Sequence, residues 1–185
     1  MEAWHRRDFL KIGMAAVVGT ILPVNTIAAT LGNASDERTL RFQNLNTWET
    51  LRVCYFKNNA LQPKALCQIN YILRDHHTNS IQPIDTDLID LLYNVDQQIV
   101  GETVFQVLSG YRSPQTNQLL RMQTKGVAKN SFHIQGQAID IRIAGCNTSC
   151  LHDTCIKLQG GGVGYYPRRN FVHIDTGPVR TWQRT

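Results

Sequence analysis

The chain has 185 residues, of which 42% are hydrophobic, and a formal net charge of +5. This length accommodates one globular domain and a leader, and the apolar share is sufficient for a core. A nucleic-acid-binding protein would concentrate basic residues in a stripe interleaved with aromatics. No such stripe is present in the sequence, so we expect no nucleic-acid partner.

The N-terminus has the pattern of an export signal. Residues 5–11 contain a twin-arginine pair, and residues 12–23 form an uncharged run that is shorter than the roughly 20 residues needed to span a bilayer. We expect a twin-arginine signal peptide at 1–30, a linker at 31–38 and one domain at 39–185. The partner during export would be the twin-arginine translocon, and the destination the periplasm. A buried helix or a retained membrane anchor is the alternative.

The first half of the domain is predicted to mix strands and helices. Leu66, Ile69 and Ile72 recur at helical spacing, and an aspartate of the segment 83–87 is a candidate N-cap for a following helix. Runs of alternating or β-branched residues between turn residues indicate strands. The predicted elements are a hairpin of strands at 39–42 and 49–56, helices at 61–75 and from 85 onward, a strand at 103–108 and a helix at 115–124.

Residues 131–140 have the pattern Ser-x-His-x-x-Gly-x-Ala-x-Asp. His133 and Asp140 are separated by Gly136, where the chain can bend. Residues 138–143 then alternate, which predicts a half-buried strand with Asp140 on one face and three isoleucines on the other. An imidazole nitrogen and a carboxylate oxygen are two of the three protein ligands of a typical catalytic zinc site.

A candidate third ligand is His173. Residues 170–175 also alternate, with His173 and Asp175 on the same face. If this strand pairs antiparallel with the strand that carries Asp140, Asp140 and His173 face the same cleft. For either segment alone, a hydrogen-bonded His–Asp pair is the alternative. Two inward polar residues on two apolar strands are costly to bury without a shared purpose, which favours the metal site.

A second chemical signal is the segment Ser-Gly-Tyr-Arg-Ser-Pro at 109–114. It connects a predicted strand to a predicted helix, so Arg112 could present its guanidinium to a cleft. The planar fork of arginine suits a carboxylate or a polarised carbonyl oxygen. A surface ion pair is the alternative for this residue.

The pattern at 131–140, followed by Val-His-Ile-Asp at 172–175, resembles the zinc D-alanyl-D-alanine metallopeptidases with their hedgehog-type fold. In particular, nearly the whole chain resembles the YcbK-like murein endopeptidases. The resemblance implies an α+β fold in which helices flank a small antiparallel sheet that carries a zinc cleft. It also implies one Zn²⁺ per chain, held by His133, Asp140 and His173.

The same resemblance suggests residues that contact substrate. The segment with Arg112 lies beside the zinc in such enzymes and helps to bind substrate or the developing oxyanion. Ser131 is expected to shape the turn that holds His133, at the substrate cleft. Tyr165 and Tyr166 belong to a Gly-Val-Gly-Tyr-Tyr-Pro segment that precedes the third ligand, and we expect them to line the cleft, although one of them could be core.

The general base is less evident. Many relatives place an acid or a histidine two or three residues before the last ligand, but this chain has Phe171 and Asn170 there, and neither can serve. Asp175 lies two residues after His173 on the same strand face and is our candidate base. Alternatively, Asp175 orients the imidazole of His173.

The expected function is therefore that of an exported, monomeric zinc metallopeptidase that hydrolyses peptide cross-links between the stem peptides of peptidoglycan. One alternative is a D,D-carboxypeptidase that removes terminal D-Ala. Another is a non-catalytic cell-wall-binding module, which the missing upstream base favours. An oxidoreductase built on the cysteines is disfavoured because no Cys-x-x-Cys pair is present.

The five cysteines are an odd number, so at least one thiol stays free or pairs elsewhere. In an oxidising compartment disulfides are common. The candidates are Cys54–Cys67 and one bridge within the trio Cys146, Cys150 and Cys155. Free thiols throughout are the alternative if the protein folds before export.

Overall fold

The computed structural model describes residues 37–124 and 126–184, so the signal expected at 1–30 and most of the linker expected at 31–38 lie outside the described residues. The strands are β1 (Arg38–Asn44), β2 (Thr50–Lys57), β3 (Ala60–Leu61), β4 (Phe105–Ser109), β5 (Ala138–Ile143), β6 (Gly162–Tyr166), β7 (Phe171–Asp175) and β8 (Arg180–Gln183). The helices are α1 (Pro63–Ile72), α2 (Thr86–Gln98), α3 (Pro114–Gln123) and α4 (Thr148–Leu158), with 3₁₀ turns η2 (Phe132–Gln135) and η3 (Pro167–Arg169). The predicted α+β class is confirmed.

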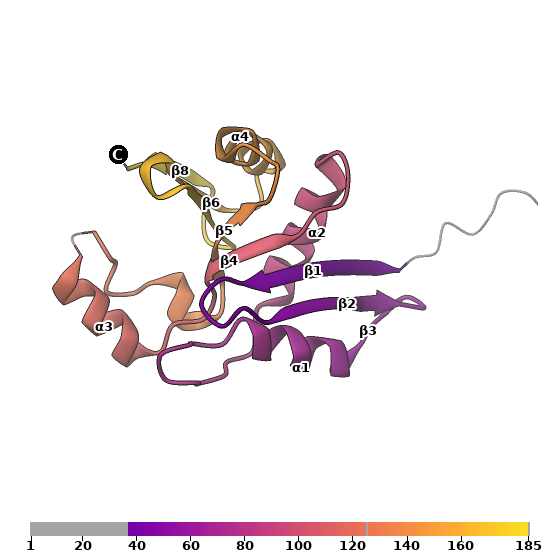
Figure 1. Ribbon diagram of the computed structural model, residues 1–185, viewed down its shortest axis with the longest axis horizontal. Coiled ribbons are helices and arrows are strands. Elements are labelled where there is room, and N and C mark those ends of the chain that lie inside the picture. Colours follow the sequence, from indigo (N-terminus) through magenta and orange to yellow (C-terminus); the bar gives the residue numbers. More distant parts are fainter. Residues whose placement is uncertain (1–36, 125, 185) are drawn as a thin grey trace, which may run out of the picture. The chain divides into compact units, whose positions relative to one another are not determined.

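All the strands belong to a single sheet of eight, in the order β3-β2-β1-β4-β5-β7-β6-β8 (Figure 1). The sheet is larger than the small antiparallel one expected, and two of its pairings, β1 with β4 and β6 with β8, are parallel. The first of these is possible because α1 and α2 lie between β1 and β4 in the chain. They provide the long crossover that a parallel pair requires.

The predicted elements of the first half are present with shifted ends. The hairpin of β1 and β2 is antiparallel, as expected. Helix α1 begins at Pro63, which suits the first helical turn, and ends at Ile72, three residues before the predicted end. Helix α2 follows its predicted cap, because the side chain of Asp85 accepts a hydrogen bond from the backbone N–H of Asp87.

Helix α4 was not predicted from the sequence. Asn147 caps its first turn by accepting from the N–H of Ser149, and Gln159 ends the helix in the left-handed conformation. Leu151 and Cys155 are buried one turn apart, and Ile156 and Leu158 pack against the core while partly buried.

The hydrophobic core lies between one face of the sheet and helices α1, α2 and α4. Ile139 and Ile141 of β5 and Val172 and Ile174 of β7 are buried in it, so both strands present their apolar residues to the core. Helix α3 stands apart from the other three helices (Figure 1). The opposite face of β5 and β7 remains available for polar side chains. Among the described residues, no helix is long and apolar enough to cross a membrane.

Both predicted disulfides are wrong in this structure, since all five cysteines have free thiols. Cys67 is exposed on α1, whereas Cys54 is half-buried in β2. Within the trio, Cys155 is buried and Cys150 is exposed. The alternative of free thiols throughout is therefore the one that the structure supports.

Candidate metal centre

His133 is held by the short turn η2. The hydroxyl of Ser131 accepts a hydrogen bond from the His133 N–H at 3.4 Å, as expected for a residue that shapes this turn. Gly136 ends the turn with φ of 71°, in the left-handed region that favours glycine. A Cβ at this position would lie 2.3 Å from the carbonyl oxygen of Pro83. The glycine thus lets the chain bend tightly against a neighbouring loop.

The other two side chains come from adjacent strands. β5 and β7 pair antiparallel, and their register sets Asp140 directly opposite His173, as predicted. Because the strands bury their isoleucines and valine on the core side, Asp140 and His173 emerge together on the other face. The turn before β5 then brings His133 to the same place.

The three side chains converge closely. His173 Nδ1 lies 2.8 Å from Asp140 Oδ1, and His133 Nε2 lies 3.2 Å from His173 Nδ1 and 3.3 Å from Asp140 Oδ1. Ligand atoms bound tetrahedrally to one zinc ion at about 2.0–2.1 Å are about 3.3 Å apart. His133 and Asp140 are buried, whereas His173 keeps 12% of its side chain exposed. The spacing therefore fits a small divalent cation.

Hydrogen bonds behind the cluster fix which imidazole nitrogens face it. His133 Nδ1 lies 2.7 Å from the carbonyl oxygen of Gly110, which can only accept, so Nδ1 carries the proton and Nε2 is the free base. His173 Nε2 lies 2.9 Å from Asp175 Oδ2 and its Nδ1 lies 2.8 Å from Asp140 Oδ1, so without a cation the ring can carry a proton on both nitrogens. With Nε2 donating to Asp175 alone, Nδ1 is the free base. Three acceptor atoms then face one another, an arrangement that a cation or an extra proton stabilises.

The electrostatics of the cluster favour an anionic Asp140 and a neutral His133. Burial would raise the pKa of Asp140, but the charges and hydrogen bonds of the two histidines hold it well below its usual value. Burial, assisted by the charge of Arg112, lowers the pKa of His133. For His173 burial acts in the same direction, yet the hydrogen bonds to Asp140 and Asp175 outweigh it and raise the pKa.

Asp175 lies behind His173 and is fully engaged. Its Oδ2 accepts from His173 and from Arg180 Nη2 at 2.7 Å, and its Oδ1 accepts from Arg180 Nη1 and the backbone N–H of Gly177, both at 2.9 Å, and from the N–H of Gly162 at 3.2 Å. The residue has no exposed surface. Although burial opposes it, these bonds lower the pKa of Asp175. Such a carboxylate is poorly placed to collect a proton from water.

Arg112 reaches the cluster from the turn between β4 and α3. Its Nη2 donates to Asp140 Oδ2 at 2.6 Å and lies 3.1 Å from His133 Nε2, while its Nε donates to the hydroxyl of Ser109 at 2.9 Å. The side chain is 14% exposed and lines the cleft. Arg112 is thus an ion-pair partner of Asp140, but one that faces the cluster and not the bulk surface.

Asp75, which no sequence pattern singles out, supports this turn. It is 2% exposed, and its carboxylate accepts from the backbone N–H of Ser113 at 2.8 Å and of His77 at 2.9 Å. Burial opposes the shift, but hydrogen bonds from Thr116 and Ser113 lower its pKa. Asp75 and Ser113 are 38 positions apart, so no local pattern could indicate this contact.

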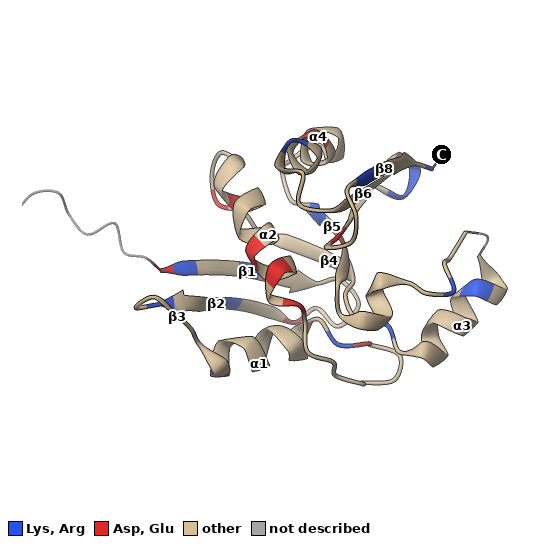
Figure 2. Cartoon of the chain, turned by 180° about the vertical axis from the view of Figure 1, so that it is seen from behind, with Lys and Arg blue, Asp and Glu red and all other residues tan. Residues whose placement is uncertain are grey.

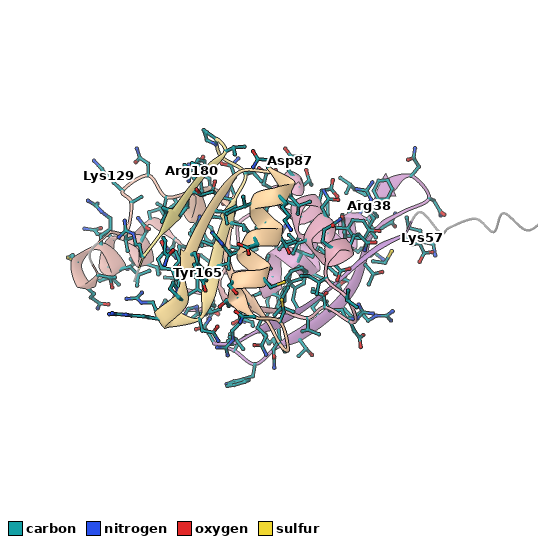
Figure 3. All side chains as sticks on the ribbon, turned by 90° about the horizontal axis from the view of Figure 1, so that it is seen from above. Arg38, Lys57, Asp87, Lys129, Tyr165 and Arg180 are labelled. Carbon is teal, nitrogen blue, oxygen red and sulfur yellow. The ribbon has the colours of Figure 1, made fainter. Side chains whose placement is uncertain are left out.

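The two tyrosines of β6 face opposite ways. Tyr166 lines the cleft, stacks on Phe171 at 4.4 Å between ring centroids and accepts from the indole N–H of Trp182. Tyr165 lies on the α4 side of the sheet, where its ring stacks on His152 at 4.8 Å (Figure 3). The expectation that both line the cleft therefore does not hold, because successive strand residues alternate between faces.

A cleft of about 1130 Å³ opens over the cluster. Trp182 of β8 forms part of its wall, with its ring 5.2 Å from that of His173. This approach needs Gly164, where a Cβ would lie 2.5 Å from the indole. The sequence alone indicates only an aromatic residue near the end of the chain at Trp182, because the parallel pairing of β8 with β6 is a tertiary feature.

Three ligand-type side chains at the floor of a cleft that can hold a peptide form the kind of site that metal-dependent peptidases use. The family model for the peptidoglycan L,D-endopeptidase MepK matches residues 32–182. The chain belongs to this family, which confirms the resemblance to murein endopeptidases.

Two relatives show the extent of the match. A probable peptidoglycan L,D-endopeptidase MepK of Haemophilus influenzae is 39% identical over 180 residues, or 97% of this chain and 96% of the relative. The peptidoglycan L,D-endopeptidase MepK of Escherichia coli K12 is 39% identical over 178 residues, or 96% of this chain and 97% of the relative. A search of solved structures gave no significant match.

Proposed function

We propose that the protein is a zinc-dependent endopeptidase that hydrolyses peptide cross-links of peptidoglycan. The observation that carries this proposal is the convergence of His133 Nε2, Asp140 Oδ1 and His173 Nδ1 within 2.8–3.3 Å of one another. Membership of the MepK family supports the substrate. In the relatives' names this substrate is peptidoglycan and the activity is L,D-endopeptidase.

His133, Asp140 and His173 would hold one zinc ion per chain. When bound, zinc supplies a Lewis acid that polarises the scissile carbonyl and lowers the pKa of water. The contribution of the protein is to present both imidazoles as free bases, which the bonds from His133 to the Gly110 carbonyl and from His173 to Asp175 support. We infer that Asp175 is a positioning residue for His173 and not the general base.

Arg112 would bind the substrate and stabilise negative charge on the carbonyl oxygen as it develops. Its bonds to Asp140 and Ser109 hold the guanidinium next to the ligand atoms before substrate arrives. Donors that are oriented in advance contribute most to this kind of stabilisation. Ser131 and Tyr166, which also line the cleft, would contact the bound peptide.

A cell-wall-binding module without turnover remains the second candidate, and a specific observation favours it. At the positions where a base is expected, Phe171 is buried against Tyr166, and the side chain of Asn170 accepts from Thr148. Neither can take a proton, and Asp175 is saturated by hydrogen bonds. A D,D-carboxypeptidase is the alternative within enzymes.

Incubation of the purified protein with muropeptide dimers distinguishes the three candidates. Release of monomers that requires zinc, stops with a chelator and is absent in His133→Ala supports the endopeptidase. Release of free D-Ala alone supports the carboxypeptidase, and binding without any product supports the module. Metal analysis should give one zinc per chain for the wild type and less for His133→Ala.

We also propose that the chain is exported to the periplasm by the twin-arginine route and acts there as a monomer. The support for export is the arginine pair at 6–7 and the uncharged run at 12–23. Replacement of Arg6 and Arg7 by lysine should leave the protein in the cytoplasmic fraction, whereas replacement of Arg41 and Arg52 by lysine should not. Equal periplasmic recovery of both variants would contradict the route.

A further inference from the structure

The walls of the cleft are strongly cationic. Among the described residues, five arginines and only two acidic side chains line it. The arginines are Arg112, Arg168, Arg169, Arg180 and Arg184, and the acids are Asp140 and Asp175. Figure 2 shows basic segments near β8 and the C-terminal end, whereas acidic segments gather on α2, away from them.

The two acids neutralise two of these arginines. Asp140 pairs with Arg112 at 2.6 Å, and Asp175 pairs with Arg180 at 2.7 Å. Arg168 and Arg169 are both exposed, and within the described part of the chain no hydrogen bond or ion pair involves their guanidinium groups. These two neighbouring positive charges therefore face the cleft uncompensated.

The backbone that carries the two arginines is well fixed. They lie in η3, which begins with Pro167 and ends at Asn170 in the left-handed conformation, with φ of 53°. The Asn170 N–H donates to the Pro167 carbonyl at 3.2 Å, and its side chain accepts from Thr148 of α4. The stacked rings of Tyr166 and Phe171 flank the turn on its two sides.

The turn leads directly into β7, so the arginines lie four and five positions before His173. The two residues that would bind a ligand here are thus close in sequence to the cluster but do not belong to it. Arginine forks bind planar anions such as carboxylates through two parallel hydrogen bonds. Adjacent like charges without counterions are unfavourable in the free protein, and an anionic ligand removes that cost.

We propose that Arg168 and Arg169 form a subsite for a free carboxylate of the bound stem peptide, at a position away from the scissile bond. This inference rests on the proposed endopeptidase function and names the feature of the peptide that the cleft selects. The occupant is a carboxylate, because carboxylates are the anionic groups of a peptide and the guanidinium fork matches their geometry. Arg112 and Arg180 are already paired with Asp140 and Asp175.

The first arm of the test is the double variant Arg168→Gln/Arg169→Gln in the full-length protein. With a cross-linked stem peptide that has free carboxylates, we expect KM to rise about tenfold, as for the loss of a charge-assisted hydrogen bond, with little change in kcat. The matched control is Arg52→Gln/Lys64→Gln, which removes the same charge from exposed residues outside the cleft and should leave KM unchanged.

The second arm uses the same peptide with its carboxylates converted to carboxamides. The wild type should lose about tenfold in kcat/KM on this substrate, whereas the Arg168→Gln/Arg169→Gln variant should process both peptides equally. Raising the salt concentration should weaken the wild-type preference for the acidic peptide.

The proposal is overturned if the variant and the control have the same KM, or if amidation reduces kcat/KM equally in wild type and variant. If the wild type cleaves neither peptide, the endopeptidase proposal fails separately. Calorimetric titration of both peptides then decides the subsite, because the wild type must still bind the acidic peptide about tenfold more tightly than the variant does.

Discussion

At the scale of single residues, the site depends on side chains that lie behind the metal cluster. The carbonyl of Gly110 accepts a hydrogen bond from one imidazole, and the carboxylate of Asp175 accepts one from the other. The second nitrogen of each ring is then left as a base. Asp75 supports the turn that carries Arg112, because its carboxylate accepts a hydrogen bond from the N–H of Ser113. These groups lie behind the cluster, and they fix the geometry of the side chains that form it.

Asp175→Asn should lower zinc affinity by about 10- to 100-fold, because the amide no longer holds His173 Nε2–H as a carboxylate does. Zinc content after dialysis against a weak chelator measures this loss. Asp153→Asn, at an exposed position of α4, should bind zinc like the wild type. If Asp175→Asn retained full zinc affinity and lost only kcat, Asp175 would be the general base after all.

Asp75→Asn should lower the free energy of unfolding at pH 7 by about 1–3 kcal/mol, the cost of weakening buried hydrogen bonds to a charged group. The pKa of Asp75 in the fold lies below its ordinary value of 3.8. Its carboxylate therefore stabilises the fold fully above pH 3.8, and this contribution is lost as the pH falls further.

Urea unfolding at pH 7 and at pH 3 tests this dependence on pH. The difference between wild type and Asp75→Asn should be smaller at pH 3. Asp153→Asn is the control for the loss of a carboxylate at an exposed site. A difference that stays constant between the two pH values would show that Asp75 does not stabilise the fold through its charge.

At the scale of elements, two features bring the cluster together. The register of β5 and β7 sets Asp140 opposite His173, and a slip of one residue would turn one of them into the core. Turn η2 and Gly136 then deliver His133 over β5. Turn η2 runs from Phe132 to Gln135, and only Gly136 and Gln137 separate it from β5.

Gly136→Ala should destabilise the protein and weaken zinc binding more than Gly145→Ala does. Both glycines have positive φ, 71° and 76°, but a Cβ at Gly136 would meet the Pro83 carbonyl at 2.3 Å, whereas nothing lies within 4 Å at Gly145. The left-handed conformation costs an alanine about 1 kcal/mol at either site. Thermal unfolding and zinc titration compare the two variants, and equal losses would refute the role of the Pro83 contact.

At the scale of the whole molecule, the core and the cleft lie on opposite faces of the same strands. β5 and β7 contribute Ile139, Ile141, Val172 and Ile174 to the core, so packing against α2 and α4 fixes the positions of Asp140 and His173. Metal binding and folding should therefore be coupled.

Addition of zinc should raise the midpoint of thermal unfolding, and a chelator should lower it. At a free zinc concentration of 100 times Kd, the expected gain in stability is about 2.7 kcal/mol. His133→Ala should have a zinc-independent midpoint. A wild-type midpoint that does not respond to zinc or to the chelator would contradict the proposed metal site.

The sequence by itself determined the local part of this description. Alternation assigned β5 and β7 and their polar faces, the spacing from His133 to Asp140 indicated a metal motif, and caps such as Asp85 marked helix starts. These signals are available because they follow from the period of the backbone and from contacts between near neighbours.

Only the tertiary structure decided the rest. The parallel pairing of β8, the orientation of Tyr165 toward α4, the contact of Asp75 with Ser113 and the free state of the cysteines all depend on residues that are distant in the chain. The role of Asp175 belongs to the same class, because its hydrogen bonds to Gly162 and Arg180 exist only once β6, β7 and β8 are assembled. Local periodicity cannot specify which distant groups satisfy a buried carboxylate.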